Sequence, residues 1–294
     1  MTLDIMMPFY GSFDHFRAAV ESVRAQSDPD WRLVVVDDVY PDRAPGEWLV
    51  GLGDPRISYI RNEQNLRPSR NYNKCITLMQ SDFAVLMGCD DVMLPNYVGR
   101  VKELIAQFPN AGVIQPGVSV IDENGAPSRP LADRVKAVYR FNGSGAREYR
   151  GEQLATSLLR GNWTYFPSLV WNVRELRTRD FRTDLDVVQD LAMLLEITKG
   201  GGSLVLDDTL CFNYRRHSAS VSAVTGPDGS KFAQELTLFR ETTAACTALG
   251  WPKAARAARR HFTSRLNALS EVPAAIRAKN SAGRSALLRH VFTG

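Results

Sequence analysis

The sequence has few cysteines and no long hydrophobic run, and each scarcity excludes a class of protein. Four cysteines occur among 294 residues and none forms a CxxC pair, which argues against a zinc knuckle or a disulfide framework and predicts reduced packing residues. No stretch of about 18 uncharged apolar residues occurs, so no membrane-spanning helix is predicted. The N-terminus begins as a strand without a basic, cleavable leader, and we therefore expect a cytoplasmic chain.

Two nucleotide-binding signatures are also absent. No GxGxxG follows the first apolar run, and neither GxxxxGKS nor GxxxxGKT occurs, which excludes the dinucleotide fingerprint and the P-loop. A nucleotide on this chain must then be held by side chains, carboxylates and a metal ion. The hydrophobic content of 44% is sufficient for one large domain, or for a domain with an appendage.

Positive charge is concentrated at the C-terminal end. Residues 251–294 contain nine Lys or Arg and a single acid, a net charge of +8, whereas the first 250 residues hold 27 basic and 31 acidic residues. Such a segment fits an anionic membrane surface or a phosphate-rich partner, or is a solvated helical face. Apolar residues at helical spacing predict helices that pack on the preceding domain, form a homo-oligomer contact or rest peripherally on the inner face of a membrane, and the sequence does not choose.

Strand and helix patterns alternate over the first 110 residues. Apolar runs predict strands at 3–7, 32–36, 57–60 and 83–87, with helices at 14–26, 68–80 and 96–108 between and after them. This succession predicts an α/β fold with a mostly parallel central sheet. Later patterns predict strands at 110–121 and 203–214, a helix within 181–200, a polar acceptor-facing loop at 122–151 and a hinge at Thr225–Ser230.

Polar residues follow three of the predicted strands where they end. These are Pro8 to Tyr10, Asp37 with Asp38, and Asp90 with Asp91. Ligands of parallel α/β sheets bind beyond the carboxyl ends of the strands, so we expect the three segments to meet in one crevice. Adjacent carboxylates repel unless a cation or hydrogen-bond donors compensate them, and oxygen ligands favour Mg²⁺ or Mn²⁺. A solvated turn is the alternative interpretation of Asp90 and Asp91.

Six segments in order carry a resemblance to a known family: MMPFY, VVVDDVYPD, NLRPSRNYN, LMGCDDVMLP, VVQDLAMLL and FNYRRHSASVS. Over roughly residues 3–222 the chain resembles the family 2 glycosyltransferases of the GT-A fold. The resemblance implies a Rossmann-like GT-A catalytic domain at 1–225, with a nucleotide-sugar half at about 1–110 and an acceptor half at about 111–225. A basic helical extension would follow at 226–294.

The resemblance also implies a reaction and assigns roles to residues. The reaction is metal-dependent, inverting transfer of a sugar from a nucleoside diphosphate donor, with UDP favoured, to a hydroxyl of a glycan or lipid-linked acceptor, as in polysaccharide biosynthesis, without nucleic acid. The cofactor is Mn²⁺ or Mg²⁺, with Asp91 on the metal. The nucleotide contacts are Pro8, Tyr10, Asp38, Arg70 and Asp90. Turn capping is the alternative for Asp38, and an exposed place on the first turn of its helix is the alternative for Arg70.

The acceptor side centres on Asp190, which the resemblance makes the general base. A sugar hydroxyl is too weak an acid to ionise at neutral pH, so its attack requires a carboxylate that accepts the proton. A carboxylate at an apolar helix start is also costly unless it is paired or used. Asp184 and Asp186 are alternative bases, although an N-cap role suits either better.

Three further residues are candidates for the diphosphate or the acceptor. His217 is expected as a metal or phosphate ligand and Arg215 as a charge clamp on the diphosphate, whereas an exposed loop position is the alternative for His217. Trp163 is expected to stack on an acceptor sugar, with core packing as the alternative, and Phe166 is expected in the core.

The chain departs from the family pattern at two positions. Gly88 stands where many relatives carry an acid, which predicts a weaker metal site, and Tyr40 replaces a small hydroxyl residue near the base pocket. Two other functions remain open at this point. A nucleotidyltransferase would use a similar scaffold, but a glycine-rich basic loop near residues 8–14 is missing. A non-catalytic nucleotide-sugar or glycan-binding module is the third alternative.

Overall fold

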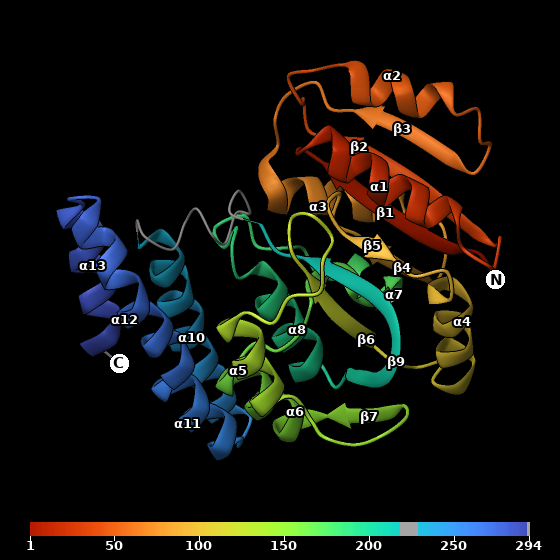
Figure 1. The fold of residues 1–294 in the computed structure, drawn as a ribbon. Coiled ribbons are helices and arrows are strands. Elements are labelled where there is room, and N and C mark those ends of the chain that lie inside the picture. The colour runs from red at the N-terminus through yellow and green to blue at the C-terminus, as the bar shows by residue number, and fades with distance from the viewer. Residues whose placement is uncertain (218–228, 293–294) are drawn as a thin grey trace.

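The computed structural model describes residues 1–217 and 229–292. Over these residues a nine-stranded sheet lies at the centre, and the C-terminal helices gather at one side of it (Figure 1). Its first half contains β1 (Leu3–Phe9), α1 (Phe13–Arg24), β2 (Trp31–Asp37), α2 (Ala44–Gly51), β3 (Ile57–Arg61), α3 (Arg67–Leu78), β4 (Phe83–Leu86), β5 (Val92–Met93) and α4 (Tyr97–Gln107). The second half contains β6 (Val113–Ile121), α5 (Leu131–Tyr139), β7 (Arg147–Arg150), α6 (Gly151–Arg160), a 3-10 turn (Phe166–Ser168), β8 (Val170–Asn172), α7 (Val173–Arg177), α8 (Gln189–Lys199) and β9 (Ser203–Arg215).

The sheet has the order β3-β2-β1-β4-β8-β6-β9-β5, and β7 pairs with β9 off this path. The four strands from β3 to β4 are parallel, and β6 and β9 run in the same direction, whereas β5, β7 and β8 run against it. The predicted α/β fold with a mostly parallel sheet is therefore confirmed. The chain order reverses between β1 and β4, which makes this the position where a ligand is expected.

The two faces of the sheet bury separate cores because side chains alternate along a strand. Ile5 and Val35 point toward α1 and α4, where Phe16 and Val101 are fully buried. Their neighbours Met6 and Val34 point the other way, into a larger core with α3, α6 and α8. Burial on both faces explains why these strands read as continuous apolar runs in the sequence. The packing fixes the strand ends that carry the acids.

The stretch 122–151 was expected to be a polar loop, and this prediction is wrong in part. It contains α5 and β7. The apolar residues of α5 do not mark a buried face, since Leu131 and Val138 are 72% and 75% exposed. Polar contacts hold the helix instead: Asp133 accepts two hydrogen bonds from the Arg216 guanidinium, at 2.8 and 2.9 Å, and one from the Tyr165 hydroxyl. Such partners lie too far along the chain for a periodicity to reveal them.

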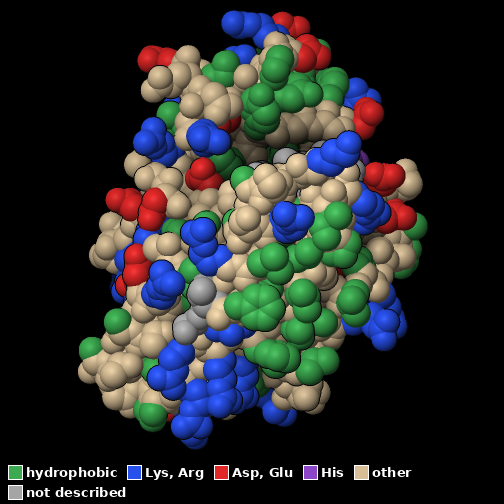
Figure 2. Space-filling view, turned by 90° about the vertical axis from the view of Figure 1, so that its left-hand side faces the viewer, with side chains coloured by type: hydrophobic (Ala, Val, Ile, Leu, Met, Phe, Trp, Pro, Cys, Tyr) green, Lys and Arg blue, Asp and Glu red, His purple; other side chains and the backbone are tan. Residues whose placement is uncertain are grey.

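The C-terminal segment forms α10 (Ser230–Ala248), α11 (Pro252–Arg260), α12 (Phe262–Arg277) and α13 (Ser281–Phe292). Helices α10 and α11 join the large core through Leu238, Phe239, Ala254 and Ala258. Helices α12 and α13 form a second layer around a small core with Phe232 at its centre. Figure 2 shows the face of the molecule on which these helices lie. The predicted boundary at residue 225 and most of the predicted hinge fall outside the described residues.

Candidate active site

The carboxyl ends of β1, β2 and β4 open at one edge of the sheet. Their parallel register continues past the strand ends, because the Asp38 N–H donates to the Phe9 carbonyl at 2.9 Å and the Met87 N–H donates to the Met6 carbonyl at 2.9 Å. The segments that carry Tyr10, Asp38 and Asp90 therefore leave the sheet side by side. This is the edge at which the sequence places its three polar strand ends.

Asp91 is the most unusual carboxylate at this edge. It is buried, with 1% of its surface exposed, and its Oδ1 accepts a hydrogen bond from the Arg215 backbone N–H at 2.8 Å. Its Oδ2 is buried without a hydrogen-bond partner among the described residues. Burial, followed by the charge of Asp90, raises the pKa of Asp91 well above its ordinary value. An orphaned buried carboxylate oxygen is costly, and a divalent cation is a group that would satisfy it.

Gly88 makes room for this acid pair. A Cβ at Gly88 would lie 2.8 Å from Asp90 Oδ1 and closer still to Asp91 Oδ2. The two carboxylates thus converge over a residue that has no side chain. The acid that many relatives carry at this position would collide with both carboxylates in this geometry. The observed arrangement of Asp90 and Asp91 therefore requires a glycine at position 88.

Arg215, the expected diphosphate clamp, has a structural role. Its side chain is 6% exposed, and its guanidinium donates to the backbone carbonyls of Asp90, at 2.6 Å, and of Asp122 and Glu123, at 3.2 and 3.0 Å. These three bonds use Nε and Nη1 of the guanidinium. Arg215 therefore fixes the acid loop to the loop after β6, and its expected contact with the diphosphate stays a prediction.

His217 and Asp90 contact each other directly. The Nε2 atom of His217 lies 2.7 Å from Asp90 Oδ2, and this bond raises the pKa of the imidazole above its ordinary value. A second imidazole stands beside it, since the rings of His15 and His217 are 5.7 Å apart, and His15 Nε2 lies 3.1 Å from the Glu123 carbonyl. His15 was not predicted as a site residue from the sequence. Its place in the first turn of α1, five residues after Tyr10, could have indicated that it lies near the strand ends.

Asp38 stabilises a turn, in agreement with the alternative interpretation. Its two oxygens accept hydrogen bonds from the Leu66 N–H at 2.7 Å, the Arg67 N–H at 2.9 Å and the Asn62 side chain at 2.8 Å. The carboxylate therefore fixes the entry into α3. With 4% of Asp38 exposed, little of it is accessible to a nucleobase, and the expected contact stays a prediction. The neighbouring Val39 has φ of +64°, a strained conformation for a β-branched residue.

Tyr10 and Arg70 remain available to a ligand. Tyr10 is 55% exposed and its ring meets the Tyr40 ring edge-on, with 5.6 Å between the centroids. Arg70 is exposed on the first turns of α3. Pro8 is half-buried near the end of β1. An aromatic ring and a guanidinium at the strand ends suit a base and a phosphate, respectively.

Asp190 lies in the first turn of α8, half-buried, with both oxygens hydrogen-bonded. Oδ1 accepts from the Leu191 N–H at 2.7 Å, and Oδ2 accepts from the Asn162 side chain at 3.0 Å. Thr164 in turn donates to Asn162 Oδ1 at 2.7 Å, which sets the orientation of the amide. Burial raises the pKa of Asp190, while the Asn162 hydrogen bond and the nearby charge of Lys136 lower it. The sequence reading identified Asp190 but missed this support.

Tyr72 is a half-buried tyrosine whose pKa is affected by both Asp90 and Asp190. It lies on α3, and its ring packs on the rings of Phe166 and Phe181 at centroid distances of 5.0 and 5.5 Å. Burial raises the pKa of its phenol, and the charges of Asp90 and Asp190 add to this effect. The charges of two carboxylates 100 positions apart in the chain thus act in the same direction on the pKa of one phenol. Phe166 belongs to this aromatic core, as expected.

Trp163 is a core residue, and the expected stacking on an acceptor is corrected. Its side chain is fully buried, and its indole N–H donates to Ser157 Oγ at 3.1 Å. A ring without an exposed face offers nothing to a sugar. The sequence could not distinguish this case, because an aromatic residue in a loop fits either role.

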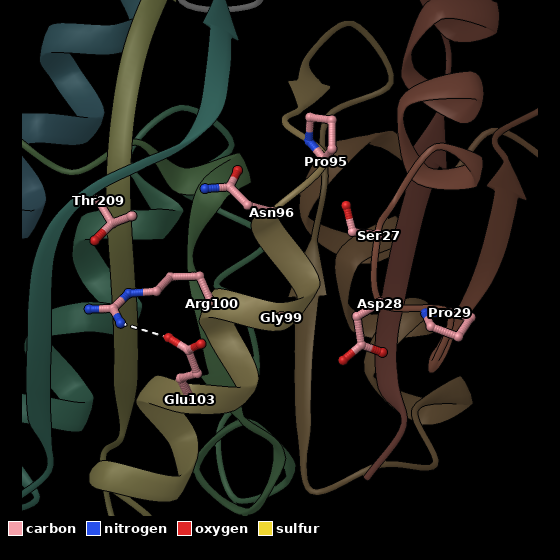
Figure 3. Close-up of a pocket in the computed structure, with 9 residues that line it drawn as sticks. All are labelled: Ser27, Asp28, Pro29, Pro95, Asn96, Gly99, Arg100, Glu103 and Thr209. Atoms are coloured by element: carbon pink, nitrogen blue, oxygen red, sulfur yellow. Dashed lines mark hydrogen bonds and ion pairs between the residues drawn. The ribbon is translucent and has the colours of Figure 1, made fainter.

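A pocket of about 710 Å³ lies elsewhere on the molecule, between the α1–β2 connection and α4 (Figure 3). Ser27, Asp28 and Pro29, which line it, precede β2, so this part of the pocket is at the opposite end of that strand from Asp38. Arg100, also in its wall, is paired with Glu103 and Asp207. None of the lining residues belongs to the acidic edge.

Comparison with known proteins decides the family. The model of glycosyl transferase family 2 matches residues 4–167, more than half of the chain. The chain belongs to glycosyl transferase family 2. The relatives of this glycosyltransferase include the uncharacterized protein MT1568 of Mycobacterium tuberculosis, 26% identical over 74% of this chain and 68% of the relative. The putative glycosyltransferase EpsE of Bacillus subtilis is 25% identical over 42% of this chain and 45% of its own length.

The protein y4gI of Sinorhizobium fredii is 32% identical over 108 residues, which are 36% of the glycosyltransferase and only 12% of that relative. Solved structures share the fold over almost the whole chain. S. aureus TarS in complex with UDP-GlcNAc has a TM-score of 0.69 at 17% identity, covering 99% of this chain and 82% of that one. The mannosyltransferase PcManGT from Pyrobaculum calidifontis, in complex with GDP-Man and Mn²⁺, has a TM-score of 0.61 at 12% identity, covering 99% and 87%. The GT-A fold is thereby confirmed.

Proposed function

We propose that this glycosyltransferase moves a sugar from a nucleoside diphosphate donor, UDP in the first instance, to a hydroxyl of a glycan or lipid-linked acceptor with inversion at the anomeric carbon. The observation that supports the proposal is the buried acid pair at the strand ends, where Asp91 Oδ2 has no hydrogen-bond partner among the described residues, together with the carboxylate of Asp190 that Asn162 and Leu191 orient. A carboxylate beside the diphosphate and a second carboxylate on the acceptor side are what such a transfer requires. A role in polysaccharide biosynthesis and a cytoplasmic location belong to the same proposal.

The residues present fit a divalent cation. Asp91 offers the orphaned Oδ2 and Asp90 stands next to it, although no group of three or more His, Cys, Asp or Glu side chains preformed for a metal occurs among the described residues. Mg²⁺ and Mn²⁺ commonly take few protein ligands and complete their shell with phosphate oxygens and water. Asp91, with Asp90 or His217, would hold the ion, which when bound would neutralise charge on the departing diphosphate.

The proposed step uses this chain's own groups as follows. The acceptor hydroxyl oxygen attacks the anomeric carbon from the face opposite the diphosphate, and Asp190 accepts the hydroxyl proton as the new C–O bond forms. The bond between the anomeric carbon and the diphosphate oxygen breaks, and its electron pair leaves with the nucleoside diphosphate. Attack from the opposite face inverts the anomeric centre, by the geometric logic that holds for inverting glycosidases. Asn162 keeps Asp190 oriented during this transfer.

Nucleotide binding and transfer can be tested separately. Thermal unfolding with UDP, GDP or dTDP, each with and without Mn²⁺, identifies the nucleotide as the one whose stabilisation depends on the metal. Asp190→Asn is expected to bind UDP with Mn²⁺ like the wild type and to lose transfer. Near-normal transfer by this variant would exclude Asp190 as the base. Release of pyrophosphate from a nucleoside triphosphate would favour a nucleotidyltransferase, and binding without turnover over a broad acceptor panel would favour a binding module.

A further inference from the structure

Helix α12 carries an apolar stripe on the side that faces away from the protein. Phe262, Leu266, Leu269, Pro273 and Ile276 follow one another at alternating intervals of four and three residues, so they lie along one side of the helix. The four large side chains other than Pro273 are 60%, 49%, 49% and 54% exposed, in chain order, and Pro273 is exposed as well. We name these five residues the α12 stripe. A helix of a globular protein normally turns such a stripe toward its core.

The opposite side of α12 makes the contacts with the rest of the chain. Ser264, Ala268 and Ala275 are buried there, and Ala268 and Ala275 meet Phe232 of α10 and Leu287 of α13. Val272 also packs on this small core, but the four largest apolar side chains of α12 point outward. The side of α12 that packs on α10 and α13 therefore carries mostly small residues. The α12 stripe remains exposed among the described residues and can contact a partner.

Basic residues are frequent in the segment that carries the stripe. Exposed Lys and Arg residues of the last 44 residues lie on α11, at the end of α12, in the α12–α13 connection and on α13; they are Lys253, Arg256, Arg259, Arg260, Arg277, Lys279, Arg284 and Arg289. The only acid in this segment is Glu271. Figure 2 shows hydrophobic side chains gathered on this face beside groups of Lys and Arg. An apolar stripe near cationic side chains is complementary to a lipid bilayer, which has an apolar interior and, where its lipids are acidic, an anionic surface.

We propose that the α12 stripe and the basic residues near it dock the protein on an anionic lipid membrane. The large apolar side chains would enter the boundary between headgroups and acyl chains while Arg and Lys contact lipid phosphates. A second copy of the chain is a poorer occupant, because two segments with a net charge of +8 each would be brought together. Among the described residues no helix is long and apolar enough to cross a bilayer, so this would be contact at the surface. The proposal goes beyond sugar transfer and does not depend on it.

The test is co-sedimentation of the full chain with two kinds of vesicle. One contains phosphatidylcholine alone, and the other adds phosphatidylglycerol, each at low and at high salt. The wild type is expected to bind the anionic vesicles at least about tenfold more tightly than the neutral ones, with much of the difference lost at high salt. Leu266→Ser with Leu269→Ser should weaken binding to anionic vesicles by about tenfold. The control pair, Val50→Ser with Leu210→Ser, changes residues that are 65% and 47% exposed away from the stripe, and should bind like the wild type.

Three results would overturn the proposal. They are equal or absent binding to both kinds of vesicle, equal losses in the stripe pair and the control pair, and a lipid-free dimer in light scattering that disappears in the stripe pair. The last result would identify a second copy as the occupant. Unfolding temperatures of all variants, measured without lipid, show whether a loss reflects misfolding. Arg256→Gln with Arg259→Gln and Arg260→Gln should reduce only the component of binding that salt also removes.

Discussion

The Nδ2 atom of Asn162 lies 3.0 Å from Oδ2 of Asp190, on the side of the carboxylate away from the Leu191 N–H. Asn162 is itself oriented by the Thr164 hydroxyl, and the Thr164 carbonyl accepts a hydrogen bond from Lys136 Nζ at 2.7 Å. One chain of contacts thus runs from the amine of half-buried Lys136 to the proposed base. Its members come from α5, the segment before the 3-10 turn and α8, so the orientation of the proposed base depends on the packing of these three segments.

Asn162→Ala is the direct test of this support. Removing a donor to the ionised carboxylate raises the pKa of Asp190, so the acidic limb of the pH profile of kcat/KM should move to higher pH. We expect kcat to fall about tenfold with little change in KM for the donor. Thr164→Val should give a smaller shift in the same direction, and Thr178→Val, at an exposed threonine of another segment, should give none. A profile that moves to lower pH in Asn162→Ala would contradict this role.

Lys136 is expected to help catalysis at the expense of stability. Burial, with the charge of Arg216, lowers its pKa to about 8. Because the unfolded amine binds its proton more tightly, stability increases with pH between about 8 and the unfolded pKa of about 10.4. The buried charge is therefore destabilising at pH 7, and Lys136→Met should raise the unfolding temperature by about 3 °C there, with a smaller gain at pH 9.

The same substitution should slow the reaction. The charge of Lys136 lowers the pKa of Asp190, so its removal should reduce kcat/KM at pH 6 by about tenfold. Lys102→Met is the control, because Lys102 is paired with Asp28 and Asp30 on the surface and its pKa is raised. That control should lower the unfolding temperature slightly and leave activity unchanged. A Lys136→Met variant that loses stability at pH 7 would show that its hydrogen bond outweighs its desolvation.

Gly88→Ala tests whether the acid pair needs an empty position. The new Cβ would meet Asp90 Oδ1 and Asp91 Oδ2, and overpacking of this kind costs about 1–3 kcal/mol. We expect Mn²⁺-dependent UDP binding to weaken at least about tenfold in titration calorimetry, since each carboxylate must move. Gly51→Ala is a matched control on α2, where a Cβ meets nothing within 4 Å, and it should bind UDP normally. Unchanged metal-dependent binding in Gly88→Ala would separate the metal from this acid pair.

The sequence predicted the strands and the position of the acids because both leave local signals. Strands β1, β2 and β4 are buried on both faces, so each appears as a continuous apolar run, and Asp38 and Asp90 stand where the runs stop. Their approximate boundaries followed from the same runs. The parallel arrangement followed from the alternation with helices.

The functions of single side chains were predicted less well, because they depend on distant partners. Asp38 holds Leu66 and Arg67, nearly 30 positions away, and Arg215 holds the loop of Asp90, 125 positions away. No spacing rule reveals whether a carboxylate or guanidinium is already paired. Helix α5 was missed for a related reason, since its residue Asp133 is held by Arg216, 83 positions away.

The C-terminal helices should lose stability at acidic pH because they bury a neutral imidazole, that of His290. His290 is 1% exposed; its Nε2 lies 2.6 Å from Ser264 Oγ and 4.0 Å from Glu235, and the rings of His261 and Phe232 face it.

Burial, with the nearby charges of His261, Arg265 and Lys231, lowers the pKa of His290 to about 4. The unfolded imidazole takes up its proton near pH 6.5 and the folded one does not, so stability should fall as the pH drops from about 6.5 to about 4. His290→Gln should be less stable than the wild type at pH 7 and should lose less stability between pH 7 and pH 4.5. Thermal unfolding at the two pH values measures this, with His15→Gln as the control. If both variants lose as much stability as the wild type, the acid sensitivity arises elsewhere in the molecule.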